Sequence, residues 1–164
     1  VIGKIRPVLK SNVLIVLGSN RHEIKSRISR LQVESCFNKN FEEGMLSSVA
    51  CGFNSLPEDA EAVLVFLGDQ PQISTGVIRA VIKGRQQTNK GIVIPTYHGK
   101  RGHPVLIDTT YKEAVNRLDR QKGLRQLMQK FAEDIAEVET GKNEVLRDID
   151  TPADYQFEIE KSNQ

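Results

Sequence analysis

Stretches of consecutive apolar residues alternate along this chain with segments whose apolar residues recur at helical spacing. Residues 13–17 are apolar at every position and end at Gly18, and residues 62–67 repeat the pattern and end at Gly68. A strand that is apolar at every position is typical of a sheet that is covered on both faces. The alternation of such strands with helices predicts an α/β layer fold.

The rest of the chain continues this alternation. Asn20 and Ser74 are the expected N-caps of two helices. No linker divides the pattern, and 164 residues suffice for one core, so we expect a single domain over residues 1–164. Further strands are expected over 33–37, 91–95, 104–107, 135–138 and 145–149, and helices over 22–31, 44–56, 112–118, 123–131 and from Pro152.

The composition of the chain indicates which classes of binding partner to exclude. The 23 basic residues nearly cancel the 21 acidic ones, and no basic block stands out, so we expect no nucleic-acid partner. No apolar run approaches the roughly 18 residues that cross a bilayer, so we expect no membrane partner. Cys36 and Cys51 match neither a zinc motif nor a disulfide framework, which favours a reducing, cytoplasmic location. The chain opens at Val1 within a helical pattern, and we expect further residues upstream.

Two acidic segments lie where this kind of fold binds ligands. Asp69 follows the strand of residues 62–67, and open α/β sheets bind ligands at the carboxyl ends of their strands. Asp150 follows the strand expected over 145–149. Carboxylates there suit Mg²⁺, which keeps water ligands and bridges phosphates. Turn formation explains residues 68–71 almost as well, because Gly68 allows a bend and Pro71 fixes φ.

Two further segments are candidate ligand loops. Gly44, Ser47 and Ser48 lie at an expected helix start, where free N–H groups favour anionic or carbonyl oxygens. Tight helix–sheet packing explains the same small residues. Residues 100–104 combine cations, a glycine and an imidazole before a strand, and can hold a phosphate or a heteroaromatic ring. A solvated, hairpin-like loop with an exposed His103 is the alternative.

Five segments, taken in order and spacing, resemble the molybdenum-cofactor cytidylyltransferase family, within the MobA-like NTP transferases. Several motifs in the right order are more specific than any one of them alone. The resemblance extends over almost the whole chain. The matching segments are VLGSN (16–20), NKNFEEGMLSSVACG (38–52), VLVFLGDQP (63–71), IVIPTYHGKRGHPVLI (92–107) and LRDIDTPADY (146–155).

The resemblance implies a Rossmann-like, three-layer α/β/α fold with a mostly parallel sheet, as in nucleotide-diphospho-sugar transferases. It implies Mg²⁺-dependent transfer of CMP from CTP to the phosphate of molybdopterin, with release of pyrophosphate. A molybdenum hydroxylase is the implied client. The residues that match the family's site are Asp69 and Asp150 as catalytic metal ligands, Gly44, Ser47, Ser48 and Gly68 for the nucleotide, and Arg101, Gly102, His103 and Pro104 for the acceptor.

The chain departs from the family pattern at two places. Lys39 stands where the family often has Pro. The strand and glycine-rich loop with which the family begins are missing, so we expect a fold that is incomplete at its N-terminus. The missing loop keeps a non-catalytic alternative open, a carrier or insertion chaperone for the pterin cofactor. The enzyme alternatives use GTP, or take a sugar or alcohol phosphate as acceptor.

Overall fold

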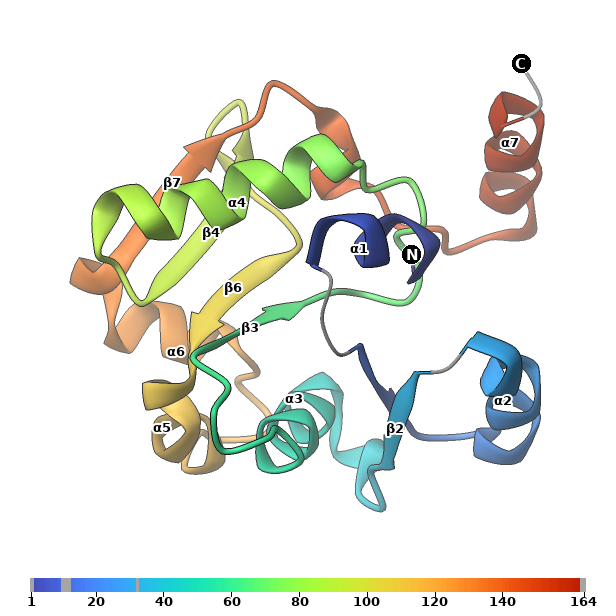
Figure 1. The fold of residues 1–164 in the computed structure, drawn as a ribbon, viewed down its shortest axis with the longest axis horizontal. Coiled ribbons are helices and arrows are strands. Elements are labelled where there is room, and N and C mark those ends of the chain that lie inside the picture. The colour runs from blue at the N-terminus through green and yellow to red at the C-terminus, as the bar shows by residue number, and fades with distance from the viewer. Residues whose placement is uncertain (1, 10–12, 32, 163–164) are drawn as a thin grey trace. The chain divides into compact units, whose positions relative to one another are not determined.

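The computed structural model describes residues 2–9, 13–31 and 33–162 (Figure 1). No helix in those ranges has the length and apolar composition needed to span a bilayer. The helices are α1 (Ile2–Leu9), α2 (Arg21–Ile28), α3 (Met45–Asn54), α4 (Thr75–Thr88), α5 (Lys112–Asn116), α6 (Arg125–Lys130) and α7 (Pro152–Ser162). The strands are β1 (Leu14–Leu17), β2 (Glu34–Phe37), β3 (Ala62–Val65), β4 (Ile92–Tyr97), β5 (Lys100–Arg101), β6 (Val105–Asp108) and β7 (Ile135–Glu139).

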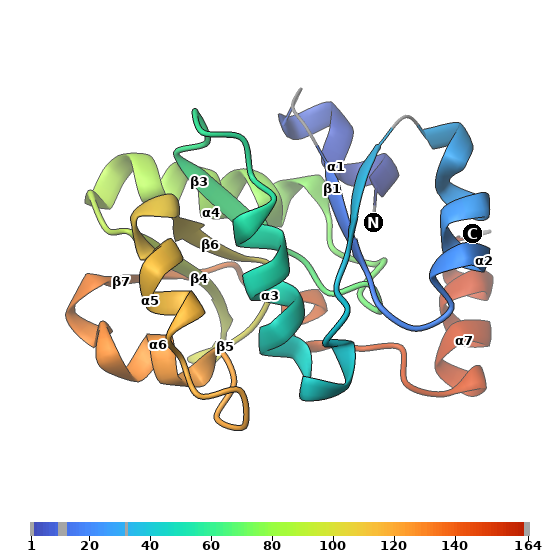
Figure 2. The ribbon, with the colours of Figure 1, turned by 90° about the horizontal axis from the view of Figure 1, so that it is seen from below.

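The strands form two sheets, and the chain forms two compact units. Strands β3, β6, β4 and β5 are neighbours in that order, and β7 also pairs with β4 (Figure 2). Strands β1 and β2 form a parallel pair. The first unit comprises the described residues of Val1–Val8, Leu64–Leu106 and Ala136–Gln164, and the second those of Leu9–Val63 and Ile107–Ile135. The expectation of a single domain stays a prediction, and each unit is described by itself.

In the first unit, helix α4 packs along strand β4 (Figure 1). Val77, Ile78 and Val81 are at most 1% exposed, and each such burial contributes about 1.5–3 kcal/mol. Gly84 allows the close approach, because a Cβ there would lie 2.6 Å from a methyl carbon of Val138. The predicted N-cap of this helix is confirmed, since the Ser74 hydroxyl accepts a hydrogen bond from the Val77 N–H.

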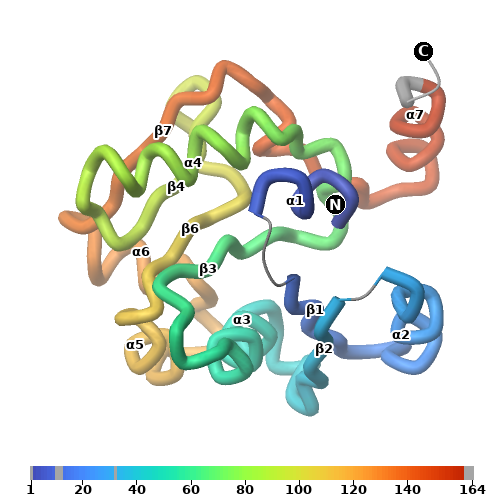
Figure 3. Tube along the Cα trace, in the orientation of Figure 1, coloured from blue at the N-terminus to red at the C-terminus, as the bar shows by residue number. Residues whose placement is uncertain are grey.

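In the second unit, helix α3 packs against the β1–β2 pair, as the trace in Figure 3 shows. Leu46 and Phe53 are each 1% exposed and form the buried face of the helix. Gly52 lies against Val16, where a Cβ would come within 3.3 Å of a methyl carbon. Helix α5 contributes Val115, which is fully buried. Helix α3 thus covers the apolar run of β1, in which Leu17 is buried and the other three residues are partly exposed.

The prediction of a strand over residues 145–149 is wrong. Residues 143–146 form a 3₁₀ turn, and the residues that follow have no regular structure. Val145 is fully buried, as expected for an apolar residue of this segment. Its carbonyl accepts a hydrogen bond from the His103 N–H at 2.9 Å, and the Ile149 N–H donates to the Asp69 carbonyl at 2.9 Å. The backbone is thus paired with two loops instead of a neighbouring strand.

The predicted side-chain cap at Asn20 is wrong. Asn20 precedes α2 with φ of 53°, a left-handed conformation that asparagine tolerates, and its side chain makes no cap hydrogen bond. After β4 the chain forms a hairpin in which Tyr97 pairs with Lys100. Its two turn residues, His98 and Gly99, have φ of 48° and 73°, as a tight hairpin turn requires.

The two cysteines lie next to each other although they are far apart in sequence. Cys36 Sγ on β2 and Cys51 Sγ on α3 are 3.6 Å apart, and both are free thiols. Burial, followed by the hydrogen bond with Cys36, raises the pKa of Cys51 to about 11. The spacing of fifteen residues gave no sign of this contact, which depends on packing between a strand and a helix.

We expect Cys51 to resist alkylation by iodoacetamide at pH 7.5 in the native protein. With a pKa of about 11, its reactive thiolate form amounts to on the order of one molecule in 3,000. Mass spectrometry of the proteolysed protein measures the modified fraction, and the same reaction in urea is the control in which both cysteines react. Rapid labelling of Cys51 in the folded protein would contradict the assigned environment.

Candidate functional site

The first unit brings the two predicted acidic segments together. Gly68 and Asp69 lie in the loop after β3, and both are exposed. The Asp69 carbonyl accepts the hydrogen bond of the Ile149 N–H at 2.9 Å, and Asp150, also exposed, is the next residue. The backbones that carry Asp69 and Asp150 are therefore in direct contact. Both carboxylates lie beside this contact, and their role as metal ligands stays a prediction.

Two glutamine side chains strengthen this contact. Gln70 is 2% exposed, and its Nε2 donates to Oδ1 of Asp148 at 2.6 Å. Gln72 donates in the same way to the carbonyl of Arg147. Each of these hydrogen bonds contributes on the order of 1 kcal/mol, and together they hold one acidic loop against the other. The sequence reading assigned no role to Gln70, although it belongs to the same tetrapeptide as Asp69.

Helix α1 adds a third contact to the same loop. Lys4 Nζ donates to the carbonyl of Pro71 at 2.8 Å, and the neighbouring Ile5 is 5% exposed. A lysine ammonium that satisfies a loop carbonyl fixes the loop's backbone without occupying the Asp69 carboxylate. The sequence gave no signal for this interaction, because Lys4 is one cation among many.

The predicted acceptor loop packs against the residues that precede Asp148. Gly102 N–H donates to the Pro95 carbonyl, and the following His103 N–H donates to the Val145 carbonyl, each at 2.9 Å. A Cβ on Gly102 would clash with the Val145 carbonyl oxygen and lie 2.7 Å from its carbon. Glycine is therefore required here by the close approach of two backbones. Pro104, next along the chain, is buried.

The His103 side chain lies close to the acidic loops. Burial lowers its pKa, while a hydrogen bond to the Val65 backbone and the charges of Asp148 and Asp69 oppose this change. The imidazole is therefore neutral near pH 7. Its Nδ1 is buried and has no hydrogen-bond partner among the described residues. The alternative of an exposed His103 in a solvated loop is wrong, because the side chain turns inward after the hairpin.

Arg101 differs from the other three predicted acceptor residues. It lies on β5, and its guanidinium forms an ion pair with Glu137 of β7 at 2.7 Å. Both side chains are 45% exposed. Gly102 and His103 are thus held against the loop that precedes Asp148, whereas Arg101 is held by the neighbouring edge of the sheet.

The second unit contains the predicted small-residue segment. Gly44 precedes α3 with φ of 93°, a left-handed value that favours glycine. The Ser47 hydroxyl donates to the Gly44 carbonyl at 2.8 Å. Asn38, 4% exposed, donates through Nδ2 to Ser47 Oγ at 2.7 Å and to Ser48 Oγ at 3.0 Å. The helix start is therefore fixed by one buried amide, which the sequence reading did not single out.

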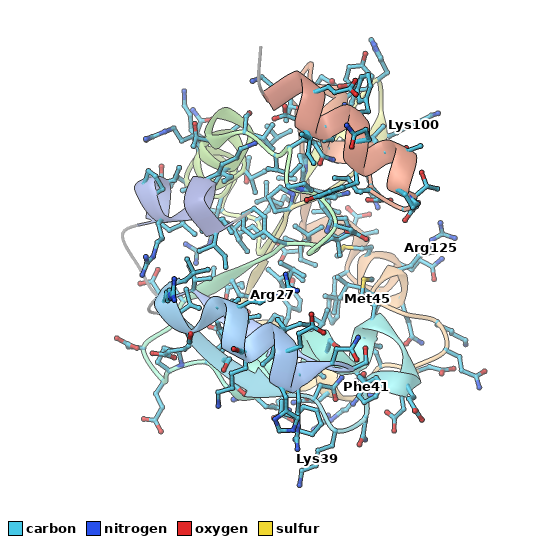
Figure 4. All side chains as sticks on the ribbon, turned by 90° about the vertical axis from the view of Figure 1, so that its right-hand side faces the viewer. Arg27, Lys39, Phe41, Met45, Lys100 and Arg125 are labelled. Carbon is cyan, nitrogen blue, oxygen red and sulfur yellow. The ribbon has the colours of Figure 1, made fainter. Side chains whose placement is uncertain are left out.

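A second side chain reaches the same helix start from the loop after α5. Arg120 donates to the Leu46 carbonyl at 3.4 Å, and its Nε lies 3.7 Å from a carboxylate oxygen of Glu43. In Figure 4, Lys39 points outward from this segment, and Met45, 49% exposed, lies at the beginning of α3. The surface at this helix start is thus open to solvent around a rigid backbone.

Comparison with known proteins identifies the family. A family model described as the MobA-like NTP transferase domain matches residues 1–137. The chain belongs to this family. It is therefore a nucleotidyltransferase, as the resemblance of its motifs implied. The match includes residues 38–52, 63–71 and 92–107, which carry most of the predicted site, and it ends before Asp148 and Asp150.

The chain is also similar to a relative in sequence and to two solved structures in fold. The chain is 25% identical over 146 residues to the molybdenum cofactor cytidylyltransferase of Escherichia coli (strain K12), which covers 88% of this chain and 72% of the relative. The 4-diphosphocytidyl-2C-methyl-D-erythritol synthase of Anaerococcus prevotii DSM 20548 superposes with a TM-score of 0.80 at 15% identity, over 99% of this chain and 84% of that one.

A protein of Mycobacterium tuberculosis H37Rv in complex with manganese superposes with a TM-score of 0.75 at 19% identity, over 97% of this chain and 85% of that one. At these identities the likeness to the two solved structures shows the fold alone. It confirms the predicted three-layer α/β/α fold.

Replacement of Gly102 tests the contact between the acceptor loop and Val145. We expect Gly102→Ala to lower the free energy of unfolding by about 2–3 kcal/mol, because the new methyl group overlaps a backbone carbonyl. Urea unfolding followed by circular dichroism measures the change. Gly76→Ala in α4 is the matched control, since its Cβ meets nothing closer than 3.6 Å and should leave stability unchanged or raise it by up to about 1 kcal/mol. Equal stability of the two variants would contradict the close approach.

Proposed function

We propose that this nucleotidyltransferase transfers CMP from CTP to the phosphate of molybdopterin and releases pyrophosphate, in a reaction that depends on Mg²⁺. The observation that carries the proposal is the hydrogen bond between the Ile149 N–H and the Asp69 carbonyl, which holds two acidic segments together. The relative from Escherichia coli, a molybdenum cofactor cytidylyltransferase, supports the choice of nucleotide and acceptor.

The donor set near Asp69 fits Mg²⁺. No group of three or more His, Cys, Asp or Glu side chains that could enclose a metal occurs among the described residues. Mg²⁺ is usually bound by one or two carboxylates together with waters and substrate phosphates, so it needs no such cage. Asp69 and Asp150, exposed on adjacent backbone, are the residues that would hold it. When bound, the ion neutralises charge on the triphosphate and on the leaving pyrophosphate.

The remaining residues orient the two substrates. Gly44, Ser47 and Ser48 form the start of α3, where the base and ribose bind in this proposal. Gly68 lets the triphosphate approach the backbone beside Asp69. Catalysis then rests on placing the acceptor phosphate in line with the α-phosphate, since phosphoryl transfer requires little covalent chemistry from the protein.

The acceptor loop supplies contacts for the pterin. In this proposal the pterin reaches His103 once a rearrangement uncovers its buried, unpartnered Nδ1, which then accepts a hydrogen bond from a ring N–H. Gly102 and Pro104 fix the backbone on either side of it. Arg101 reaches the acceptor only if its ion pair with Glu137 opens, and an exposed pair of this kind contributes about 0–1 kcal/mol, so the cost is small.

The proposal also includes a cytoplasmic location and a molybdenum hydroxylase as client. Cys36 and Cys51 support the location, since they match neither a zinc motif nor a disulfide framework. The client follows from the family resemblance, because a cytidylylated pterin needs an acceptor enzyme.

Replacement of Asp69 tests the proposed metal role. We expect Asp69→Asn in the full-length protein to lower Mg²⁺-dependent pyrophosphate release from CTP and molybdopterin by about 100-fold or more, because the amide removes a charged ligand. A coupled pyrophosphate assay over a range of Mg²⁺ concentrations measures the effect. Asp59→Asn, at an exposed position in the loop before β3, is the matched control and should keep the wild-type rate.

The same assay separates the enzyme from its alternatives. Pyrophosphate release with GTP but not with CTP would change the nucleotide while keeping the reaction. A carrier of the pterin would bind molybdopterin equally well in EDTA, release no pyrophosphate, and be indifferent to Asp69→Asn. Wild-type activity in Asp69→Asn would remove the metal role that we assign to this residue.

A further inference from the structure

Strand β7 ends at a carboxylate that accepts hydrogen bonds from several directions. The strand pairs with β4, and Glu139 is its last residue (Figure 1). Oε1 of Glu139 accepts from the backbone N–H groups of His98 at 3.3 Å and Gly141 at 3.2 Å. Its Oε2 accepts from the Thr96 hydroxyl at 3.0 Å and from the Gly99 N–H at 3.4 Å. One side chain thus joins the end of β4, the turn of the β4–β5 hairpin and the turn after β7.

These donors match the acceptor capacity of an ionised carboxylate. Three of them are backbone N–H groups, which can only donate, and a carboxylate offers two oxygens with about four lone-pair sites. Desolvation raises the pKa of Glu139, but the four hydrogen bonds, led by that of the Gly141 N–H, lower it by more. The side chain is therefore ionised near pH 7. The sequence reading assigned it no role, because its donors on β4 and in the hairpin turn lie 40 to 43 positions earlier in the chain.

The hairpin turn leads directly into the proposed acceptor loop, residues 101–104. Strand β5 comprises two residues, and both are exposed. The loop itself is held by two backbone hydrogen bonds, in which the Gly102 N–H and the His103 N–H each donate at 2.9 Å. On the side of the turn, the short ladder between β4 and β5 is supplemented by the carboxylate of Glu139. This side chain therefore sets the direction in which the chain enters the loop.

We propose that Glu139 is a positioning residue for the transfer reaction, which fixes the hairpin turn and thereby presents residues 101–104 to the phosphate-bearing pterin acceptor. The inference rests on the proposed function, which places the acceptor at this loop. Glu139 touches neither substrate in this scheme and acts through the backbone of the turn. Glu137, two residues earlier on the same face of β7, holds the Arg101 side chain instead. Loss of Glu139 should therefore weaken binding of the acceptor and leave binding of CTP unchanged.

The size of the effect depends on how often the released loop takes up its binding conformation. An apparent dissociation constant rises in inverse proportion to the fraction of the protein in the competent conformation. A loop that is correctly placed about one-tenth of the time therefore binds the acceptor about tenfold more weakly. We expect a fraction of this order, because the two backbone hydrogen bonds of Gly102 and His103 remain. CTP binds at the start of α3 in the proposed function and does not depend on this loop.

Steady-state kinetics of two variants test the positioning role in the full-length protein with Mg²⁺. We expect Glu139→Ala to raise the KM for molybdopterin about tenfold and to leave the KM for CTP unchanged. Glu139→Gln should give a smaller rise, of about threefold, because the amide oxygen still accepts from backbone N–H groups while the amide nitrogen faces the Gly99 N–H. A general loss of stability would lower kcat instead, since it reduces the fraction of active protein.

Glu113 on α5 provides the matched controls. Its carboxylate is 75% exposed and pairs with Arg117 at 3.3 Å. Glu113→Ala and Glu113→Gln make the same chemical changes at a distance from the hairpin in sequence and in a different unit. Both should leave the two KM values and kcat as in the wild type.

Amide hydrogen exchange followed by NMR tests the same role without substrates. In Glu139→Ala the two turn amides lose their acceptor, so they should exchange faster whatever the role of the residue. The positioning role requires more, namely that the amides of Gly102 and His103, which donate elsewhere, also exchange about tenfold faster. The Ile78 amide, which donates to the Ser74 carbonyl in α4, is the internal reference and should exchange as in the wild type.

The two measurements distinguish this inference from the function on which it rests. In an active protein, an unchanged KM for molybdopterin in both Glu139 variants overturns the inference, and so does unchanged exchange at Gly102 and His103. Equal rises in the KM for CTP and for molybdopterin also overturn it, since the effect would then be general. A wild-type protein that releases no pyrophosphate from CTP and molybdopterin contradicts the proposed function, and the exchange rates then decide whether Glu139 orders the loop. If Glu139→Ala does not fold, Glu139→Gln decides both comparisons.

Discussion

The hydrogen bond between the Ile149 N–H and the Asp69 carbonyl organises the first unit. Residues 145–149 are apolar enough to form a strand, yet their backbone groups are satisfied by loops. Buried N–H and C=O groups must be paired, and here the pairing joins the loop after β3, the loop after the hairpin and the segment before α7. The amides of Gln70 and Gln72 add side-chain hydrogen bonds between the same two acidic segments. The candidate site thus depends on backbone pairing and side-chain hydrogen bonds together.

Around that contact the acidic side chains are exposed, and the groups that are buried are neutral. Asp69 and Asp150 are exposed and accessible to a cation. The groups that hold them in place are amides and backbone, with Gln70 2% exposed. His103 follows the same rule, because burial lowers its pKa and keeps it neutral beside the acidic loops. Buried charge would cost several kcal/mol, and the fold avoids it here.

In the second unit, too, a buried neutral group holds the backbone in place. A single buried amide fixes the start of α3, and every atom of its side chain that can form a hydrogen bond has a partner within 3.0 Å. A polar network of this kind is stable because it is fully satisfied.

The sequence by itself determined the order of strands and helices, the N-cap at Ser74, and the family. These depend on local apolar periodicity and on motif spacing, and both are properties of residues that are close together in the sequence. The tertiary structure alone decided that residues 145–149 form no strand, that His103 turns inward, that Cys36 meets Cys51, and that Asn38 binds two serines. Each of those outcomes depends on which partner satisfies a polar or apolar group across the fold. A pattern of neighbouring residues cannot identify that partner, because the partner lies in a distant part of the sequence.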